Sequence, residues 1–210
     1  MSYFPFFTDI EGADALIVGG GKVALRKVQK LLPYGPRITV AAPEFSDELE
    51  KLEGIRLIRS PFEDGMLQNR SFVIAATDNA ELNGRISELC RSMKISVNAV
   101  DDIEKCTFIF PSLVKSGELS IGISTGGASP SAAIYMREQI ERLLPDNIGS
   151  IIEFLDSLRP FIRQTLPTEA ERSALYKKLF ARCMTLGREM NDRELENFFD
   201  KEMSHGQENR

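Results

Sequence analysis

The chain has 210 residues, of which 42% are hydrophobic and 27% charged, and its formal net charge is −5. This length suits one domain with an appendage or two small domains, and the composition excludes wholesale disorder. The acidic balance argues against a broad nucleic-acid surface, and the sequence has no apolar run near the ~18–20 residues that cross a bilayer, so we expect a cytoplasmic protein that binds neither nucleic acid nor membrane.

The first predicted strand covers residues 15–18 and stops at three consecutive glycines, Gly19, Gly20 and Gly21. With Ala24 they form the spacing G-x-G-x-x-A at the start of a predicted helix over residues 23–32. In a dinucleotide-binding turn, the first small residue permits a tight turn and the second lets the backbone approach a pyrophosphate. The third lets the helix pack closely on the sheet.

The free N–H groups and partial positive charge of a helix N-terminus suit phosphates. The alternative is a tight strand-to-helix turn that binds no ligand. A Walker-type phosphate loop is disfavoured, because Lys22 is followed by Val23 where that motif requires Ser or Thr.

Strands alternate with helices over the first hundred residues. The sequence predicts further strands over residues 37–42, 55–58, 72–76 and 95–100, and further helices over residues 45–52 and 81–93. This alternation predicts a doubly wound α/β sheet with right-handed crossovers. We expect the aromatic start of the chain to add an edge strand, formed around Tyr3, Phe4, Phe6 and Phe7.

The pattern changes after residue 106. Two β-rich runs, over residues 107–114 and 119–124, predict a hairpin, and Ser129 followed by Pro130 is a helix-start signal. Predicted helices then cover residues 131–144, 148–161, 168–186 and 192–203.

Histidine and cysteine are scarce. Cys90, Cys106 and Cys183 are scattered along the chain, as expected in a reducing cytosol, and His205 is the single histidine. The sequence therefore predicts no His- or Cys-based metal site and no Ser-His-Asp triad within one chain.

Five motifs stand in one order along the chain. They are V-G-G-G-K-V-A at residues 18–24 with Arg26-Lys27, A-A-T-D at 75–78, N-A-V-D-D at 98–102, F-I-F-P-S at 108–112 and S-T-G-G-A-S-P at 124–130. Together they resemble the siroheme synthase N-terminal family, in its stand-alone form without a methyltransferase domain. The resemblance runs from about residue 3 to past residue 186.

The resemblance implies three parts: a Rossmann-type parallel sheet that binds NAD over residues 1–106, a hairpin-and-helix region that builds a homodimer over 107–146, and an all-helical C-terminal domain over 147–210. It also implies NAD-dependent dehydrogenation of the tetrapyrrole precorrin-2 to sirohydrochlorin. Some family members also insert Fe2+ into sirohydrochlorin, so Fe2+ is a second candidate substrate. The alternative function is a non-catalytic NAD-binding sensor or scaffold on the same fold.

Asp101 matches the family's catalytic aspartate and closes the fifth predicted strand, at the sheet edge where ligands gather. As a general base it would take the proton that is lost when hydride leaves. The alternative is a carboxylate that caps the next turn. We expect the neighbouring Asp102 to point away.

Contacts with NAD and substrate are implied at other motif positions, each of which has an ordinary turn or cap as its alternative. NAD would be bound by Gly19, Gly20, Gly21, Lys22, Val23, Ala24, Pro43, Glu44, Thr77, Asp78 and Asn98. The substrate would be bound by Ser124, Thr125, Gly126 and Gly127, with basic candidates at Lys105, Lys115, Arg137, Arg163, Arg172 and Arg188. No arginine follows the second strand to meet a 2′-phosphate, which favours NAD over NADP.

Overall fold

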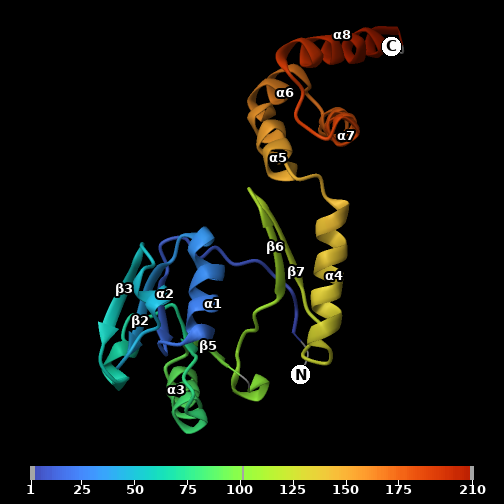
Figure 1. Ribbon diagram of the computed structural model, residues 1–210. Helices are drawn as coiled ribbons and strands as arrows, with labels where there is room; N and C mark the ends of the chain where they lie inside the picture. Colours follow the sequence, from blue (N-terminus) through green and yellow to red (C-terminus); the bar gives the residue numbers. More distant parts are fainter. Residues whose placement is uncertain (1–2, 101, 209–210) are drawn as a thin grey trace. The chain divides into compact units, whose positions relative to one another are not determined.

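The computed structural model describes residues 3–100 and 102–208 (Figure 1). The chain divides into two compact units, Met1–Phe110 and Pro111–Arg210. The second unit contains both the hairpin and the C-terminal helices. The finer division of the chain into three parts therefore stays a prediction.

The first unit contains a five-stranded sheet of the predicted Rossmann type. Its strands are β1 (Asp14–Val18), β2 (Arg37–Ala42), β3 (Ile55–Arg59), β4 (Phe72–Ala75) and β5 (Ser96–Ala99). The order is β3-β2-β1-β4-β5, and every neighbouring pair is parallel. The order reverses between β1 and β4, so the carboxyl ends of these strands form the switch point at which open α/β sheets bind ligands.

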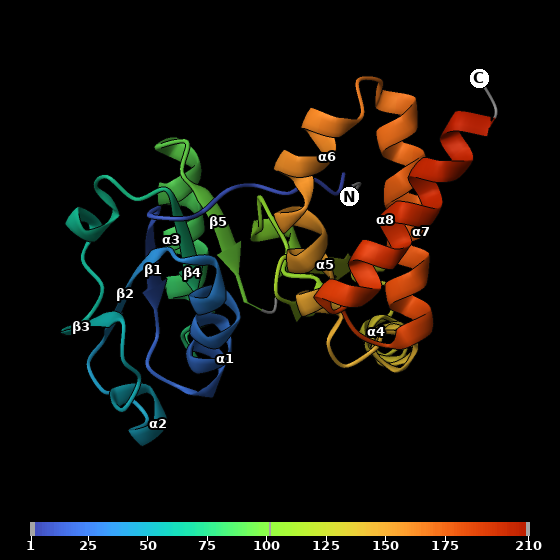
Figure 2. The same cartoon turned by 90° about the horizontal axis from the view of Figure 1, so that it is seen from above.

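Two helices cover opposite faces of this sheet (Figure 2). Helix α1 (Lys22–Leu31) buries Ala24 and Val28 in one hydrophobic core, and α3 (Ala80–Ser92) buries Ile86 and Cys90 in the other. The strands between them are apolar on both sides, as burial on two faces requires.

Shorter segments connect these elements. They are η1 (Leu32–Tyr34), α2 (Asp47–Glu50), η2 (Asp64–Leu67) and η3 (Ile103–Lys105). The helix predicted over residues 45–52 is shorter than expected, because extended backbone at Ser46 makes that residue its N-cap and Lys51 already ends it.

The second unit begins with an antiparallel hairpin of β6 (Ser112–Ser116) and β7 (Leu119–Ile123), followed by α4 (Pro130–Leu143). The hairpin is confirmed, but its first strand does not start at residue 107. The Thr107 N–H donates to the Val97 carbonyl at 2.8 Å, and Phe108 and Phe110 pack on a core of the first unit. Those residues therefore belong to the first unit, which contains the five-stranded sheet, and not to the hairpin.

The rest of the second unit is helical, as predicted. Its helices are α5 (Ile148–Ser157), α6 (Arg159–Thr165), α7 (Glu169–Leu186) and α8 (Asp192–Glu208). The single helix expected over residues 148–161 is two helices, because Pro160 lies in the first turn of α6, where its missing N–H costs no hydrogen bond. The pieces share a core that includes Ile151, Ile162 and Leu179.

The prediction of an edge strand at the start of the chain is wrong. Residues 3–10 form no strand, and the side chains of Phe4, Phe6 and Phe7 are 83%, 75% and 78% exposed. Among the helices that the structure describes, none combines the length and the apolar character needed to cross a membrane.

Candidate functional site

The first two glycines of the turn after β1 are required by the protein's own backbone. Gly19 has φ +129°, and a Cβ atom there would lie 2.2 Å from the Ala76 carbonyl oxygen. A Cβ atom at Gly20 would lie 1.8 Å from the Glu44 carbonyl oxygen. Both glycines therefore allow the segments after β1, β2 and β4 to meet, and their identity needs no ligand to explain it.

Gly21 differs from its neighbours. Its φ of −92° suits any residue, and apart from its two chain neighbours no described residue has an atom within 4 Å of the position a Cβ would take. It is the N-cap of α1, without a side-chain cap and without an acidic residue in the first turn. The first N–H groups of a helix have no intrahelical partners, so a bare glycine here leaves donors and space for an anion. These features fit a dinucleotide phosphate.

The residues predicted at the rim of this turn lie together. Lys22 is exposed and Val23 half-buried at the start of α1, while Pro43 and Glu44 are exposed directly after β2. The Ser46 N–H donates to the Gly20 carbonyl at 2.8 Å, which fixes the segment after β2 against the glycine turn. Ala24 is fully buried, consistent with close packing of α1 on the sheet.

Thr77 is a turn residue in this structure. Its hydroxyl donates to the Asn83 side-chain oxygen at 2.7 Å, and the Asn83 amide donates back to the Thr77 carbonyl at 3.0 Å. Asn79 caps α3 by accepting the Leu82 N–H. Asp78 is exposed within the same turn. The segment thus lies at the carboxyl end of β4, with the Thr77 hydroxyl already hydrogen-bonded.

Asn98 lies within β5 and is 6% exposed. Its amide nitrogen donates to the Phe108 carbonyl at 3.0 Å, and its oxygen accepts from Lys27 Nζ at 3.4 Å. The same ammonium lies 3.9 Å from the centroid of the Phe110 ring, a cation–π contact. Both polar atoms of the Asn98 side chain therefore already have hydrogen-bond partners within the protein. No sequence pattern points to this role of Lys27, because the contact joins residues 71 positions apart.

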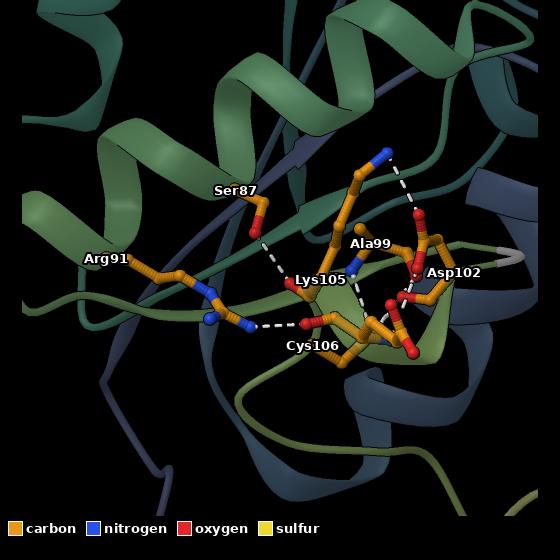
Figure 3. Close-up of polar contacts among 7 residues, drawn as sticks. Ser87, Arg91, Ala99, Asp102, Lys105 and Cys106 are labelled. Carbon is orange, nitrogen blue, oxygen red and sulfur yellow. Dashed lines mark hydrogen bonds and ion pairs between the residues drawn. The ribbon is translucent and has the colours of Figure 1, made fainter.

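Asp101 lies outside the described residues, and Figure 3 shows the polar contacts of the residues that follow it. Asp102 forms an ion pair with Lys105 at 2.9 Å and accepts the Glu104 N–H at 3.2 Å as the N-cap of η3. The Lys105 ammonium holds the pKa of the Asp102 carboxyl below its usual value. Asp102 thus caps the N-terminus of η3, and its carboxylate is the ion-pair partner of Lys105.

The residues predicted to bind substrate form a loop before α4, in the second unit. The Ser124 hydroxyl accepts the Gly126 N–H at 3.1 Å. The Thr125 hydroxyl donates to the Ser129 carbonyl and accepts its N–H, both at 3.0 Å. Ser129 in turn caps α4. Both hydroxyls therefore shape the loop, and the exposed Gly126 and Gly127 form its tip.

Most of the predicted basic partners already bind groups within the chain. Arg137 pairs with Glu141 at 2.5 Å, and Arg188 binds Glu194 through two contacts of 2.8 Å. The remaining ones are Lys115, which binds the Gly117 carbonyl, Arg172, which binds two backbone carbonyls, and the exposed Arg163. Among the side chains that the structure describes, no group of three or more histidine, cysteine, aspartate or glutamate residues is placed to hold a metal ion.

Comparison with known proteins gives matches over most of the chain. Residues 6–112 match the family described as "Putative NAD(P)-binding", and residues 116–143 match the family described as "Sirohaem biosynthesis protein central". The siroheme synthase of Pseudoalteromonas translucida is 39% identical over 183 residues, which cover 86% of this chain and 39% of the relative. That of Sodalis glossinidius is 35% identical over 216 residues, which cover 99% and 46%.

A solved structure of the same extent also matches. The structure titled "SirC, precorrin-2 dehydrogenase" superposes with a TM-score of 0.70 at 24% identity, over 95% of this chain and 98% of that one, so the two share a fold. The chain spans less than half the length of the curated relatives it matches.

Proposed function

The chain belongs to the siroheme synthase N-terminal family, and we propose from this that it oxidises precorrin-2 to sirohydrochlorin with NAD+. The reaction transfers a hydride from the tetrapyrrole to NAD+ and releases one proton. The observation that carries the proposal is the glycine turn after β1, where Gly21 keeps open space in front of the uncapped N-terminus of α1. The family's siroheme synthases and the shared fold of a precorrin-2 dehydrogenase support the choice of substrate.

The protein's part in coenzyme binding is to hold the diphosphate and the ribose. The N–H groups at the start of α1 would bind the diphosphate, beside the exposed Lys22. Glu44 follows β2 and is exposed. Its carboxylate would accept hydrogen bonds from the ribose hydroxyls and repel a 2′-phosphate. We therefore favour NAD over NADP. When bound, the nicotinamide ring supplies the hydride acceptor.

The protein's part in the chemistry is to accept the proton. Asp101 comes two residues after the end of β5, the last strand of the sheet, and its carboxylate would take the proton that the substrate loses when hydride departs. The loop of Ser124, Thr125, Gly126 and Gly127 would bind a substrate carboxylate through N–H groups at the start of α4.

The second unit leaves an apolar surface that fits a homodimer. Helix α4 exposes Ile134, Tyr135 and Met136 by 49%, 59% and 49%, and it packs on a sheet of two strands. Apolar side chains gathered on one exposed helix mark interaction sites, and a second copy of the chain would cover them. Sedimentation at micromolar concentration should give a dimer, and a monomer would contradict this assignment.

One coupled assay tests the proposed function. Purified protein, precorrin-2 and NAD+ should yield sirohydrochlorin and NADH, followed by absorbance in the nicotinamide band. NAD+ binding without reduction would favour the sensor or scaffold. Fe2+ insertion is a second candidate activity, because the curated relatives are siroheme synthases and siroheme contains iron. Adding Fe2+ to the product of the same assay tests it.

A further inference from the structure

A pocket of about 430 Å³ lies at the amino ends of β1, β2 and β3, at the edge of the sheet opposite to the glycine turn. Its polar lining is made by Asp14, Arg37, Thr39, Arg56 and Arg70. The volume falls within the roughly 300–1,000 Å³ of small-molecule sites. Three guanidinium groups thus line one pocket, although the chain as a whole has a formal net charge of −5.

The register of the strands brings these side chains to one face of the sheet. Arg37 and Thr39 are two residues apart on β2, so both point to the same side. In the parallel register Asp14 lies opposite Arg37, and Arg56 lies opposite Thr39. Neighbouring strands are about 4.8 Å apart, so the side chains of each register pair adjoin.

Arg70 reaches this face from the segment before β4 and is held there by two neutral acceptors. Its Nε donates to the Met66 carbonyl at 3.0 Å, and its Nη1 donates to the Thr39 hydroxyl at 3.1 Å. Thr39 is 5% exposed, and the other buried residues of β2 are apolar. These contacts orient the Arg70 guanidinium and leave its Nη2 without a hydrogen-bond partner among the described residues.

The pocket holds more positive charge than its own carboxylate balances. Asp14 accepts two hydrogen bonds from Arg37, from Nε at 3.0 Å and from Nη2 at 2.7 Å. The hydrogen bonds from Arg37, together with the charges of Arg37 and Arg70, hold the pKa of the Asp14 carboxyl below its ordinary value. In the part of the chain that the structure describes, neither Arg56 nor Arg70 pairs with a carboxylate. Two positive charges therefore remain.

We propose that this pocket binds the dianionic phosphate group of a small phosphate monoester. Guanidinium groups bind phosphate through paired N–H···O bonds, and Arg56 and Arg70 together balance its two negative charges. A single carboxylate would leave one of the two unbalanced. The remaining volume of the pocket would take the organic part of the ester.

The pocket is separate from the site proposed for the coenzyme. From Asp14 to Val18, β1 rises four steps of about 3.3 Å, so roughly 13 Å separates the pocket from the glycine turn. The proposal goes beyond the dehydrogenase function and is independent of it.

Calorimetry on the full chain tests the site, with glycerol 3-phosphate as the probe. The titration is made at constant ionic strength near pH 8, where a phosphate monoester is dianionic, and with excess NAD+ to occupy the glycine turn. We expect one probe molecule to bind each chain. Arg56→Gln should weaken binding roughly 10- to 100-fold, as expected for the loss of hydrogen bonds to a charged group. Arg70→Gln should weaken it likewise.

Arg59→Gln is the matched control. It makes the same change of charge on the same strand, at the end of β3 and outside the pocket, so the probe should bind as in the wild type. Arg56 is exposed and has no hydrogen bond or ion pair with another described residue, so its variant should keep the wild-type thermal unfolding temperature.

Three results would overturn the proposal. The first is the lack of saturable binding to the wild type. The second is a wild-type affinity in Arg56→Gln or Arg70→Gln, which would place the phosphate at another site. The third is an equal loss of affinity in Arg56→Gln and Arg59→Gln, which would reveal a general effect of net charge.

Discussion

The carbonyl oxygen of Glu44 occupies the place where a side chain on Gly20 would begin, 1.8 Å from the position of its Cβ atom. The obstacle is backbone, so it cannot turn aside as a flexible side chain would. We predict that Gly20→Ala destabilises the protein by about 1–3 kcal/mol, the usual cost of overpacking, measured by chemical denaturation. A free energy of unfolding equal to the wild type would contradict this packing.

Gly21→Ala should have the opposite profile. Among the residues that the structure describes, none besides the two chain neighbours has an atom within 4 Å of the added Cβ, so the free energy of unfolding should stay near the wild-type value. The methyl group would enter the space proposed for the diphosphate, and we expect NAD+ affinity to fall roughly tenfold, about 1.4 kcal/mol, by calorimetry. Unchanged affinity in this variant would place the coenzyme elsewhere.

The glycine turn also indicates how much of the fold the sequence predicts. The spacing of Gly19, Gly21 and Ala24 predicted a turn between a strand and a helix, and the apolar runs predicted the five parallel strands, because both depend on local geometry and burial. The contacts of Lys27 with Asn98 and Phe110 were not predictable in this way. These partners are set by how separate segments meet in space, which the periodicity of the sequence does not encode.

The errors have local causes. The sequence predicts the first strand of the hairpin over residues 107–114, because apolar residues there suit a strand as well as they suit a buried loop. In the structure Phe108 packs edge-on against Phe72, with ring centroids 6.1 Å apart. The prediction of one helix over residues 148–161 treats Pro160 as the end of a helix. In the structure Pro160 lies in the first turn of a new helix, α6.

Asp101 and Asp102 are neighbours with different expected roles. Asp101→Ala should lower kcat by roughly 10²–10⁴-fold, the usual contribution of a general base, while NAD+ affinity by calorimetry stays at the wild-type value. Asp102→Ala removes the cap of η3 and the exposed pair with Lys105, so it should lower stability slightly and keep most of the turnover. Wild-type rates for Asp101→Ala would eliminate the proposed base.

Acid should weaken the C-terminal helices through Glu194. Arg188 and the Asn191 N–H bind its carboxylate and lower its pKa from the ordinary 4.5 to about 2. Because the folded pKa is depressed, the carboxylate contributes full stability above pH 4.5 and loses it as pH falls toward about 2.

Denaturation of the wild type and Glu194→Gln at neutral pH and at pH near 3 tests this linkage. The wild type should be the more stable at neutral pH, and the gap should narrow in acid. Glu196→Gln, which changes an exposed carboxylate on the same helix, is the control. A gap that stays constant across this range would contradict the assignment to Glu194.

The most direct test of the account is the change in nicotinamide absorbance when the purified chain is mixed with precorrin-2 and NAD+. The account predicts that NADH appears in step with sirohydrochlorin, one molecule for each. An unchanged absorbance, with heat of NAD+ binding registered by calorimetry on the same sample, would contradict a dehydrogenase and leave a protein that binds the coenzyme without using it.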